Sequence, residues 1–250
     1  MEIDNSIFNE KINEYTTGCN YTPLKIVFNI TSPLYLTSPW LHFDSIISYL
    51  CFRDALNDLF YILPTDELID ISQLDLPLKK TNDVYHASIG IYSNIYTLKT
   101  DKVYKRFTDK ETYHLTKKQQ KGRIKINQGH FKDFIILLPT VITDKITFYC
   151  NGDKKELKRL LSHLHHIGKK SSIGGGKIHS ITITETKEDY SFFKDNQIMR
   201  TIPATMKLPI VEGMTFQQAS YKPPYWNKKN KVMCYVPPNQ IKQSLGVKNA

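Results

Sequence analysis

The chain has 250 residues, of which 40% are hydrophobic and 23% charged. This composition excludes a disordered or low-complexity chain and is typical of one domain with a good core, or of one domain plus an extension. The longest apolar run, at 134–138, has the length of a strand and is far shorter than the roughly 18–20 residues of a membrane helix. Because the N-terminus is acidic and lacks a basic signal region, we expect a soluble, cytoplasmic protein with no membrane partner.

The positive charge is concentrated in one part of the chain. Lys and Arg outnumber Asp and Glu by 34 to 24, and the formal net charge is +10. Residues 1–98 carry 5 basic and 12 acidic side chains, whereas residues 99–250 carry 29 basic and 12 acidic ones. A polyanion such as nucleic acid, bound by the C-terminal part, explains this polarity most simply. A solvated basic face, or contact with an acidic protein, is the alternative.

The first half of the chain predicts three elements of secondary structure after a polar extension at 1–22. Alternating apolar and polar residues predict a strand at 24–31. Apolar residues at helical spacing predict a helix at 44–59, with Asp44 as its N-cap. The segment 84–98 is rich in Tyr, Ile and Ser and predicts one or two further strands.

The segment 99–132 holds 11 basic and 3 acidic side chains and few large aliphatic ones. Such a segment cannot bury much surface by itself, so we interpret it as a basic hairpin, or thumb, that stands away from the core. A solvated hairpin would have the same composition. The densest basic run, suited to tracking a nucleic-acid backbone, consists of Lys117, Lys118, Lys121, Arg123 and Lys125.

The second half of the chain contains the clearest local signal. After strands expected over 134–150, Asp153 and Glu156 form a capping box ahead of a helix predicted at 154–167. A strand is predicted at 177–185, and the proline-rich remainder is expected to be irregular.

The resulting order, β–α–β–β–α–β, predicts the α+β class with a ferredoxin-like (RRM-like) core. We assign this core to 23–98 and 133–186, the inserted thumb to 99–132, and the N-terminal and irregular C-terminal extensions to 1–22 and 187–250.

The strongest candidate binding motif is the loop between the last helix and the last strand. Three consecutive glycines let the backbone approach a ligand and expose N–H groups, and cationic and hydroxyl side chains flank them. These are the parts of a phosphate-backbone cradle, although a tight helix–strand connection would also need glycines. The loop matches neither a Walker nor a dinucleotide-binding pattern. The candidate residues are Lys169, Lys170, Ser171, Gly174, Gly175, Gly176 and Lys177.

This loop, placed between the last helix and strand of a β–α–β–β–α–β chain, resembles that of the RAMP superfamily of CRISPR RNA-binding proteins. Short segments spread over 24–240 are similar to the Cas-five-like subunit of type IV class 1 CRISPR effectors. The segments are Pro-Trp-Leu-His-Phe-Asp at 39–44, Tyr-His-Ala-Ser at 85–88, Gly-His-Phe-Lys at 129–132, Tyr-Cys-Asn-Gly-Asp at 149–153, Ile-Gly-Lys-Lys at 167–170, Gly-Gly-Gly at 174–176, Asp-Tyr-Ser at 189–191, Met-Arg-Thr-Ile-Pro at 199–203 and Pro-Pro-Tyr-Trp at 223–226.

The resemblance implies a subunit of an antiviral ribonucleoprotein that grips the 5′ handle of the CRISPR RNA (crRNA) and caps the filament of backbone subunits. A large subunit and the target nucleic acid are further candidate partners. The resemblance also implies phosphate contacts for Lys132, Lys169, Lys170, Lys177 and Arg200. It also implies that His86 and His130 read a base or a 2′-hydroxyl, and that Tyr225 and Trp226 stack on a base or anchor the tail.

Three other interpretations compete with a non-catalytic RNA-binding subunit. A metal-independent RAMP endoribonuclease that processes precursor crRNA would use His86, His130 and Lys132 as acid–base and charge-stabilising groups. A pure protein-interaction subunit would use the acidic N-terminal half. A metal site at His163 and His166 is disfavoured by its cationic surroundings, and the dispersed cysteines suggest no zinc, so we expect no cofactor.

Overall fold

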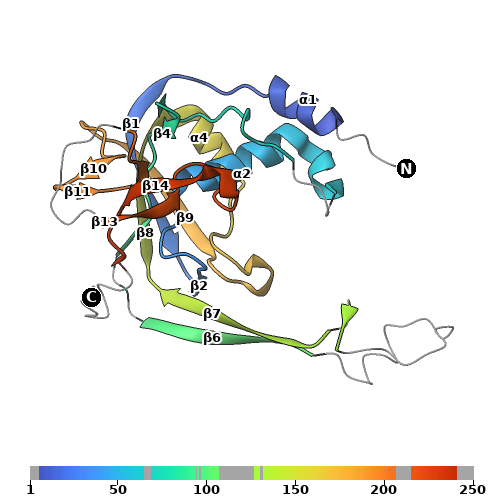
Figure 1. Cartoon of the computed structure of the whole chain (residues 1–250). Coiled ribbons are helices and arrows are strands. Elements are labelled where there is room, and N and C mark those ends of the chain that lie inside the picture. The colour runs from blue at the N-terminus through green and yellow to red at the C-terminus, as the bar shows by residue number, and fades with distance from the viewer. Residues whose placement is uncertain are drawn as a thin grey trace.

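A four-stranded antiparallel sheet, in the order β5-β8-β1-β9, organises the centre of the computed structural model (Figure 1). The structure describes residues 6–64, 69–93, 95, 97–106, 127–129, 132–206 and 215–240. In β1 the alternate side chains of Leu24, Ile26, Phe28 and Ile30 are buried, because successive residues of a strand point to opposite faces. The strands are β1 (Tyr21–Ile30), β5 (Ile91–Ser93), β8 (Lys145–Asp153) and β9 (Ile178–Glu185).

Helices α2 (Phe43–Leu56) and α4 (Lys154–Leu161) bury their apolar side chains in the core of this sheet. The predicted N-cap of α4 is confirmed, since the Asp153 carboxylate accepts hydrogen bonds from the N–H groups of Lys155 and Glu156. The helix ends at Leu161, earlier than expected, and a 3₁₀ turn, η1 (Asn57–Ile62), follows α2. The main elements therefore follow one another as β–α–β–β–α–β, as the sequence predicts, in an α+β structure with mostly antiparallel sheets.

The N-terminal extension contributes to the core although its sequence is polar overall. Helix α1 (Ser6–Glu14) inserts Phe8 and Ile12 into the hydrophobic core, and both are fully buried. Two apolar residues four positions apart lie on one face of a helix, which is enough to dock this short element. No helix in the described parts of the chain is both long and apolar enough to cross a membrane.

The start of the predicted thumb is a two-stranded ribbon that leaves the core. Strands β6 (Thr97–Lys105) and β7 (Phe134–Ile142) pair along their whole length, and Figure 1 shows the ribbon running beneath the four-stranded sheet. The first strand expected over 134–150 therefore belongs to the ribbon, and only β8 joins the central sheet. Strand β2 (Leu34–Tyr35) pairs with the other edge of β7.

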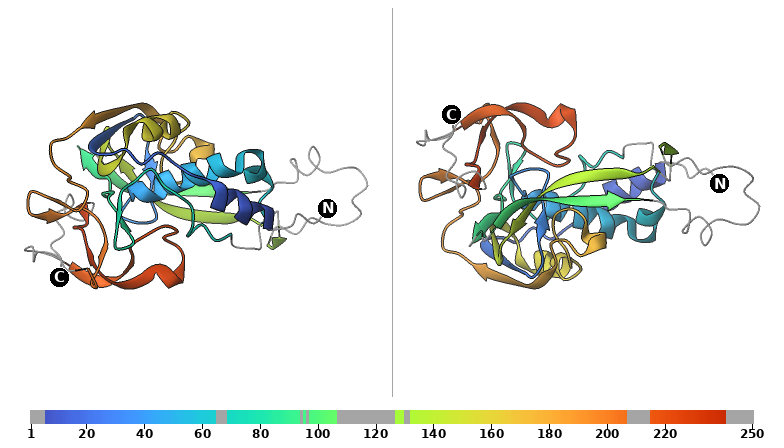
Figure 2. Two further views of the ribbon diagram at one scale, coloured as in Figure 1. Left: turned by 90° about the horizontal axis from the view of Figure 1, so that it is seen from above. Right: turned by 90° about the horizontal axis from the view of Figure 1, so that it is seen from below.

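The prediction of an irregular C-terminal extension is wrong. The extension folds into a three-stranded antiparallel sheet, which lies at the end of the molecule away from the ribbon tip (Figure 2). Of its described prolines, Pro203 lies in the short strand β12, and Pro223 and Pro224, which are joined by a cis bond, lie in the connection between β13 and β14, so these prolines do not prevent the sheet. The strands of this sheet are β12 (Ile202–Pro203), β13 (Thr215–Ser220) and β14 (Lys231–Val236). Two separate hairpins occur earlier in the chain. One pairs β3 (Lys80–Thr81) with β4 (Val84–Tyr85), and the other pairs β10 (Phe193–Lys194) with β11 (Gln197–Ile198).

Candidate nucleic-acid interface

Strand β2 joins the glycine-rich loop to the base of the ribbon. On one side Tyr35 pairs with Thr140 of β7, and on the other it bridges to Lys169 of the loop. The Lys169 N–H donates to the Tyr35 carbonyl over 3.0 Å. The glycine-rich loop and the ribbon that leads to the predicted thumb are thus attached to the same short strand.

The three consecutive glycines shape the loop from within. The N–H groups of Gly174, Gly175 and Gly176 donate to the carbonyls of Ser171, Lys170 and Pro33, over 2.9, 3.1 and 2.8 Å. They are therefore not available to a phosphate, and the expectation of a backbone N–H cradle is wrong for this conformation. The glycines instead permit a tight turn, which includes the 3₁₀ turn η3 (Ser171–Ile173).

We expect Gly176→Ala to destabilise the protein far more than Gly174→Ala. Both residues have positive φ, +60° and +82°, but a Cβ at Gly176 would lie 1.8 Å from the Ile167 carbonyl oxygen, whereas one at Gly174 meets nothing within 4 Å. The backbone conformation alone costs about 1–2 kcal/mol, and the clash should bring the loss at Gly176 to about 2–4 kcal/mol. Urea unfolding of both variants measures the difference, and equal losses would contradict this account of the loop.

The loop presents lysines to solvent around this rigid turn. Lys169 and Lys177 are exposed, and Lys170 is half-buried in the left-handed conformation (φ +61°). Within the described part of the chain, no acidic side chain forms an ion pair with any of the three. Their charge is therefore not neutralised internally and is available to an anion.

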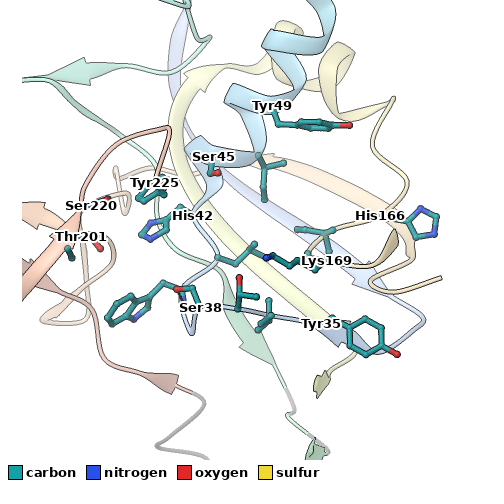
Figure 3. A pocket seen from close by; sticks show the side chains of 18 of the residues that line it. Tyr35, Ser38, His42, Ser45, Tyr49, His166, Lys169, Thr201, Ser220 and Tyr225 are labelled. Carbon is teal, nitrogen blue, oxygen red and sulfur yellow. Dashed lines mark hydrogen bonds between the residues drawn. The ribbon is translucent and has the colours of Figure 1, made fainter. Parts of the chain in front are cut away.

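A cavity of about 800 Å³ lies beside the loop, between the start of α2 and the C-terminal strand β13 (Figure 3). Its walls carry aromatic rings, hydroxyl and amide groups and two lysines, and the residues that line it include no Asp or Glu. The lysines are Lys169 and Lys231, and the predicted loop residue Ser171 also lines the cavity. Sequence reasoning missed this site because its walls come from segments far apart in the chain. The available signals were four of the family segments, at 39–44, 167–170, 199–203 and 223–226, each of which contributes lining residues.

The comparison with known families agrees with the motifs noted in the sequence. The family model described as CRISPR type IV associated protein Csf3 matches residues 22–237. The chain belongs to the Csf3 family. Csf3 is a Cas-five-like subunit of type IV CRISPR systems, so the resemblance predicted from the sequence is confirmed at this level. No curated protein matches the chain.

The thumb residues expected to contact RNA in this Csf3 protein fall mostly outside the described residues. Lys132 is described and exposed. The others, Lys117, Lys118, Lys121, Arg123, Lys125 and His130, lie outside the described ranges, so their roles remain predictions.

The prediction that Arg200 contacts phosphate is wrong for this conformation, because its side chain is 0% exposed. Its guanidinium lies 3.2 Å from the Asp44 carboxylate, which is also 0% exposed, and donates to the carbonyls of Tyr85, Ala87 and Tyr221. Asp44 was expected to cap α2, but the N-cap position is His42, and Asp44 lies in the first turn of the helix, where its carboxylate serves this buried pair. Arg200 thus fastens the C-terminal extension to the core.

The two aromatic residues suggested as stacking groups have different surroundings. Trp226 is 61% exposed and open to solvent. Tyr225 is half-buried, donates its hydroxyl to Asp44 over 2.9 Å, and stacks on His42 with ring centroids 4.0 Å apart and planes at 14°. Burial and the neighbouring Asp44 carboxylate raise the pKa of Tyr225 well above its ordinary value. Tyr225 therefore forms part of the cavity wall, whereas only Trp226 offers an unobstructed ring.

His86, a candidate base of the nuclease interpretation, has partners at both ring nitrogens. Nδ1 lies 2.8 Å from the Asp189 carboxylate and Nε2 lies 2.8 Å from the Thr81 hydroxyl. The hydrogen bonds that Asp189 accepts outweigh its burial and hold the pKa of its carboxyl well below the usual range. Through these two contacts His86 connects the β3–β4 hairpin to the C-terminal extension. No cluster of three or more potential metal ligands occurs among the described residues, which include His163 and His166.

We expect His42 to make folding stability depend on pH. Burial, assisted by the positive charge of Arg200, lowers the pKa of His42 from 6.5 to about 3 in the folded state. The unfolded chain therefore binds a proton below pH 6.5 that the folded chain excludes, and stability falls as the solution is acidified. Down to about pH 5 the loss should be about 2 kcal/mol from this group. Urea unfolding at several pH values should show this loss of stability in the wild type and not in His42→Leu. If stability falls with pH equally in the two proteins, the assignment to His42 is contradicted.

Proposed function

We propose that this Csf3 subunit binds crRNA, grips its 5′ handle and caps the filament of backbone subunits in a type IV effector complex. The observation that carries the proposal is the attachment of the lysine-rich loop and the β6–β7 ribbon to the two edges of strand β2. This arrangement would give RNA a path from the loop lysines along the ribbon toward the thumb. Single-stranded RNA is bound by such cationic tracks combined with aromatic stacking surfaces.

The fold offers a consistent setting for this role. We infer that the sheet β5-β8-β1-β9 with α2 and α4 is a ferredoxin-like RAMP core, in which the ribbon is the root of an inserted thumb. The positively charged part of the chain would then face RNA. The acidic N-terminal part, which cannot favour RNA, would face neighbouring protein subunits.

The proposal is tested by purifying the assembled complex from cells that express its subunits together with a repeat array. We expect RNA with one defined 5′ end to co-purify with this subunit, as shown by the ratio of absorbance at 260 and 280 nm and by sequencing the extracted RNA. The same preparation without the array serves as the control. An assembled complex that contains no RNA would overturn the proposal.

A further inference from the structure

The cavity beside the glycine-rich loop contains buried polar atoms without partners. His42 Nδ1, Thr201 Oγ1 and Ser220 Oγ are inaccessible to solvent and form no hydrogen bond in the described structure. His42 is 9% exposed, Thr201 0% and Ser220 8%. Leaving a buried polar group unpaired is unfavourable, and native proteins keep few of them. The three residues line the same cavity, so a hydrogen-bonding ligand seated there would give these groups partners once their side chains turn toward it.

The three residues lie together on one side of the cavity. Figure 3 shows Thr201, Ser220 and His42 beside Tyr225 in one region of the cavity, while Tyr35 and His166 lie at the opposite side. The two hydroxyls can turn by rotation about χ1, and each can then donate or accept a hydrogen bond. The stack of Tyr225 on His42 adds a rigid aromatic surface, which the hydrogen bond from Tyr225 to Asp44 holds in place.

The positive charge at the cavity comes from two lysines. The Lys169 side chain extends into the cavity from the glycine-rich loop (Figure 3), and Lys231 contributes from β14. The side of the cavity formed by His42, Thr201 and Ser220 has neutral groups only, since the low pKa of His42 keeps that ring uncharged at neutral pH. An acidic peptide would place carboxylates against these neutral groups, and a lipid tail would leave the hydroxyls unpaired. A nucleotide has the complementary pattern of a planar, neutral, hydrogen-bonding base with a phosphate at one end.

We propose that this cavity binds one unpaired nucleotide, with its base against His42, Thr201 and Ser220 and its phosphate at Lys169. A cavity of about 800 Å³ is within the usual size range of small-ligand sites and large enough for any of the four bases. The nucleotide could belong to an RNA chain or be free in solution. The proposed RNA-binding function favours the first source, and to that extent the inference rests on it.

The test compares RNA strands that carry bases with a strand of the same backbone that carries none. Labelled single strands of about twelve nucleotides, as rA, rC and rU homopolymers and as an abasic ribose-phosphate chain, are titrated with the full-length protein. We expect the best base-bearing strand to bind roughly tenfold or more tightly than the abasic chain. The double variant Thr201→Val, Ser220→Ala should lose this advantage and bind the abasic chain as the wild type does.

Folding of the variant is controlled in two ways. Thr201→Val and Ser220→Ala remove unpaired hydroxyls with little change in volume, so the urea unfolding midpoint should not fall. Thr37→Trp is a second variant, because Thr37 is exposed and lines the cavity, and a bulky ring there should block entry without disturbing the core. It too should lose the preference for base-bearing RNA.

The outcomes separate this inference from the proposed function. Equal binding of base-bearing and abasic chains would overturn the inference and leave RNA binding intact. Binding of AMP, CMP, GMP or UMP in equilibrium dialysis, sensitive to Thr37→Trp but accompanied by no RNA binding, would support the cavity as a free-nucleotide site and overturn the proposed function. Binding of neither RNA nor mononucleotide would overturn both.

Discussion

Replacing Arg200 by Ala should lower the free energy of unfolding by about 3–5 kcal/mol, because it leaves the buried Asp44 carboxylate without its charge partner. Both side chains are 0% exposed, and the guanidinium also donates to four backbone carbonyls. Urea unfolding of the purified chain, followed by circular dichroism, measures the loss. Since the pair joins α2 to the C-terminal extension, proteolysis of the extension should accelerate in parallel.

An exposed arginine provides the matched control for this prediction. Arg159 lies 2.7 Å from Asp54, but the two side chains are 44% and 30% exposed, so Arg159→Ala should cost about 1 kcal/mol or less. The double variant Asp44→Leu, Arg200→Met removes both buried charges and should recover much of the stability that Arg200→Ala loses. If Arg200→Ala costs no more than Arg159→Ala, the buried pair does not fasten the extension.

The same pair shows where sequence reasoning reaches its limit. Local patterns predicted β1 and the Asp153 cap because alternation, helical spacing and capping depend on neighbours in the chain. Arg200 and Asp44 are 156 positions apart, and nothing local shows that each neutralises the other. The phosphate contact that the resemblance implies for Arg200, and the N-cap predicted for Asp44, both differ from the buried pair that the structure shows.

The candidate site likewise has some features that the sequence alone predicts and others that it does not. The lysines and glycines of the loop were recognisable because they are adjacent in sequence. The engagement of the glycine N–H groups was not, since one acceptor is the carbonyl of distant Pro33. The cavity was also beyond reach: its walls combine the 39–44 segment with β13, a strand that the proline content argued against. The family resemblance picked out several of these residues but gave no indication of which of them line the same cavity.

Replacing Lys169 and Lys170 together by Ala should weaken binding of single-stranded RNA about tenfold at physiological salt, if each lysine neutralises one phosphate. The physical reason is counterion release: each phosphate contact on a single strand contributes about −0.7 to the slope of log K against log salt concentration. Losing two contacts should therefore make the slope shallower by about 1.4. Fluorescence anisotropy at several salt concentrations gives both quantities from one data set.

The salt dependence discriminates a phosphate contact from a general loss of positive charge. Lys155 and Lys158 are exposed on α4, so Lys155→Ala, Lys158→Ala removes the same charge from a helix that contributes no residue to the cavity. This control should change the affinity much less and keep the wild-type slope. Because Lys169 and Lys170 lie in a turn held by backbone hydrogen bonds, their replacement should also leave the unfolding midpoint nearly unchanged. Equal effects of the two double variants on the slope would mean that the loop holds no phosphate and that RNA, if bound, follows another surface of the protein.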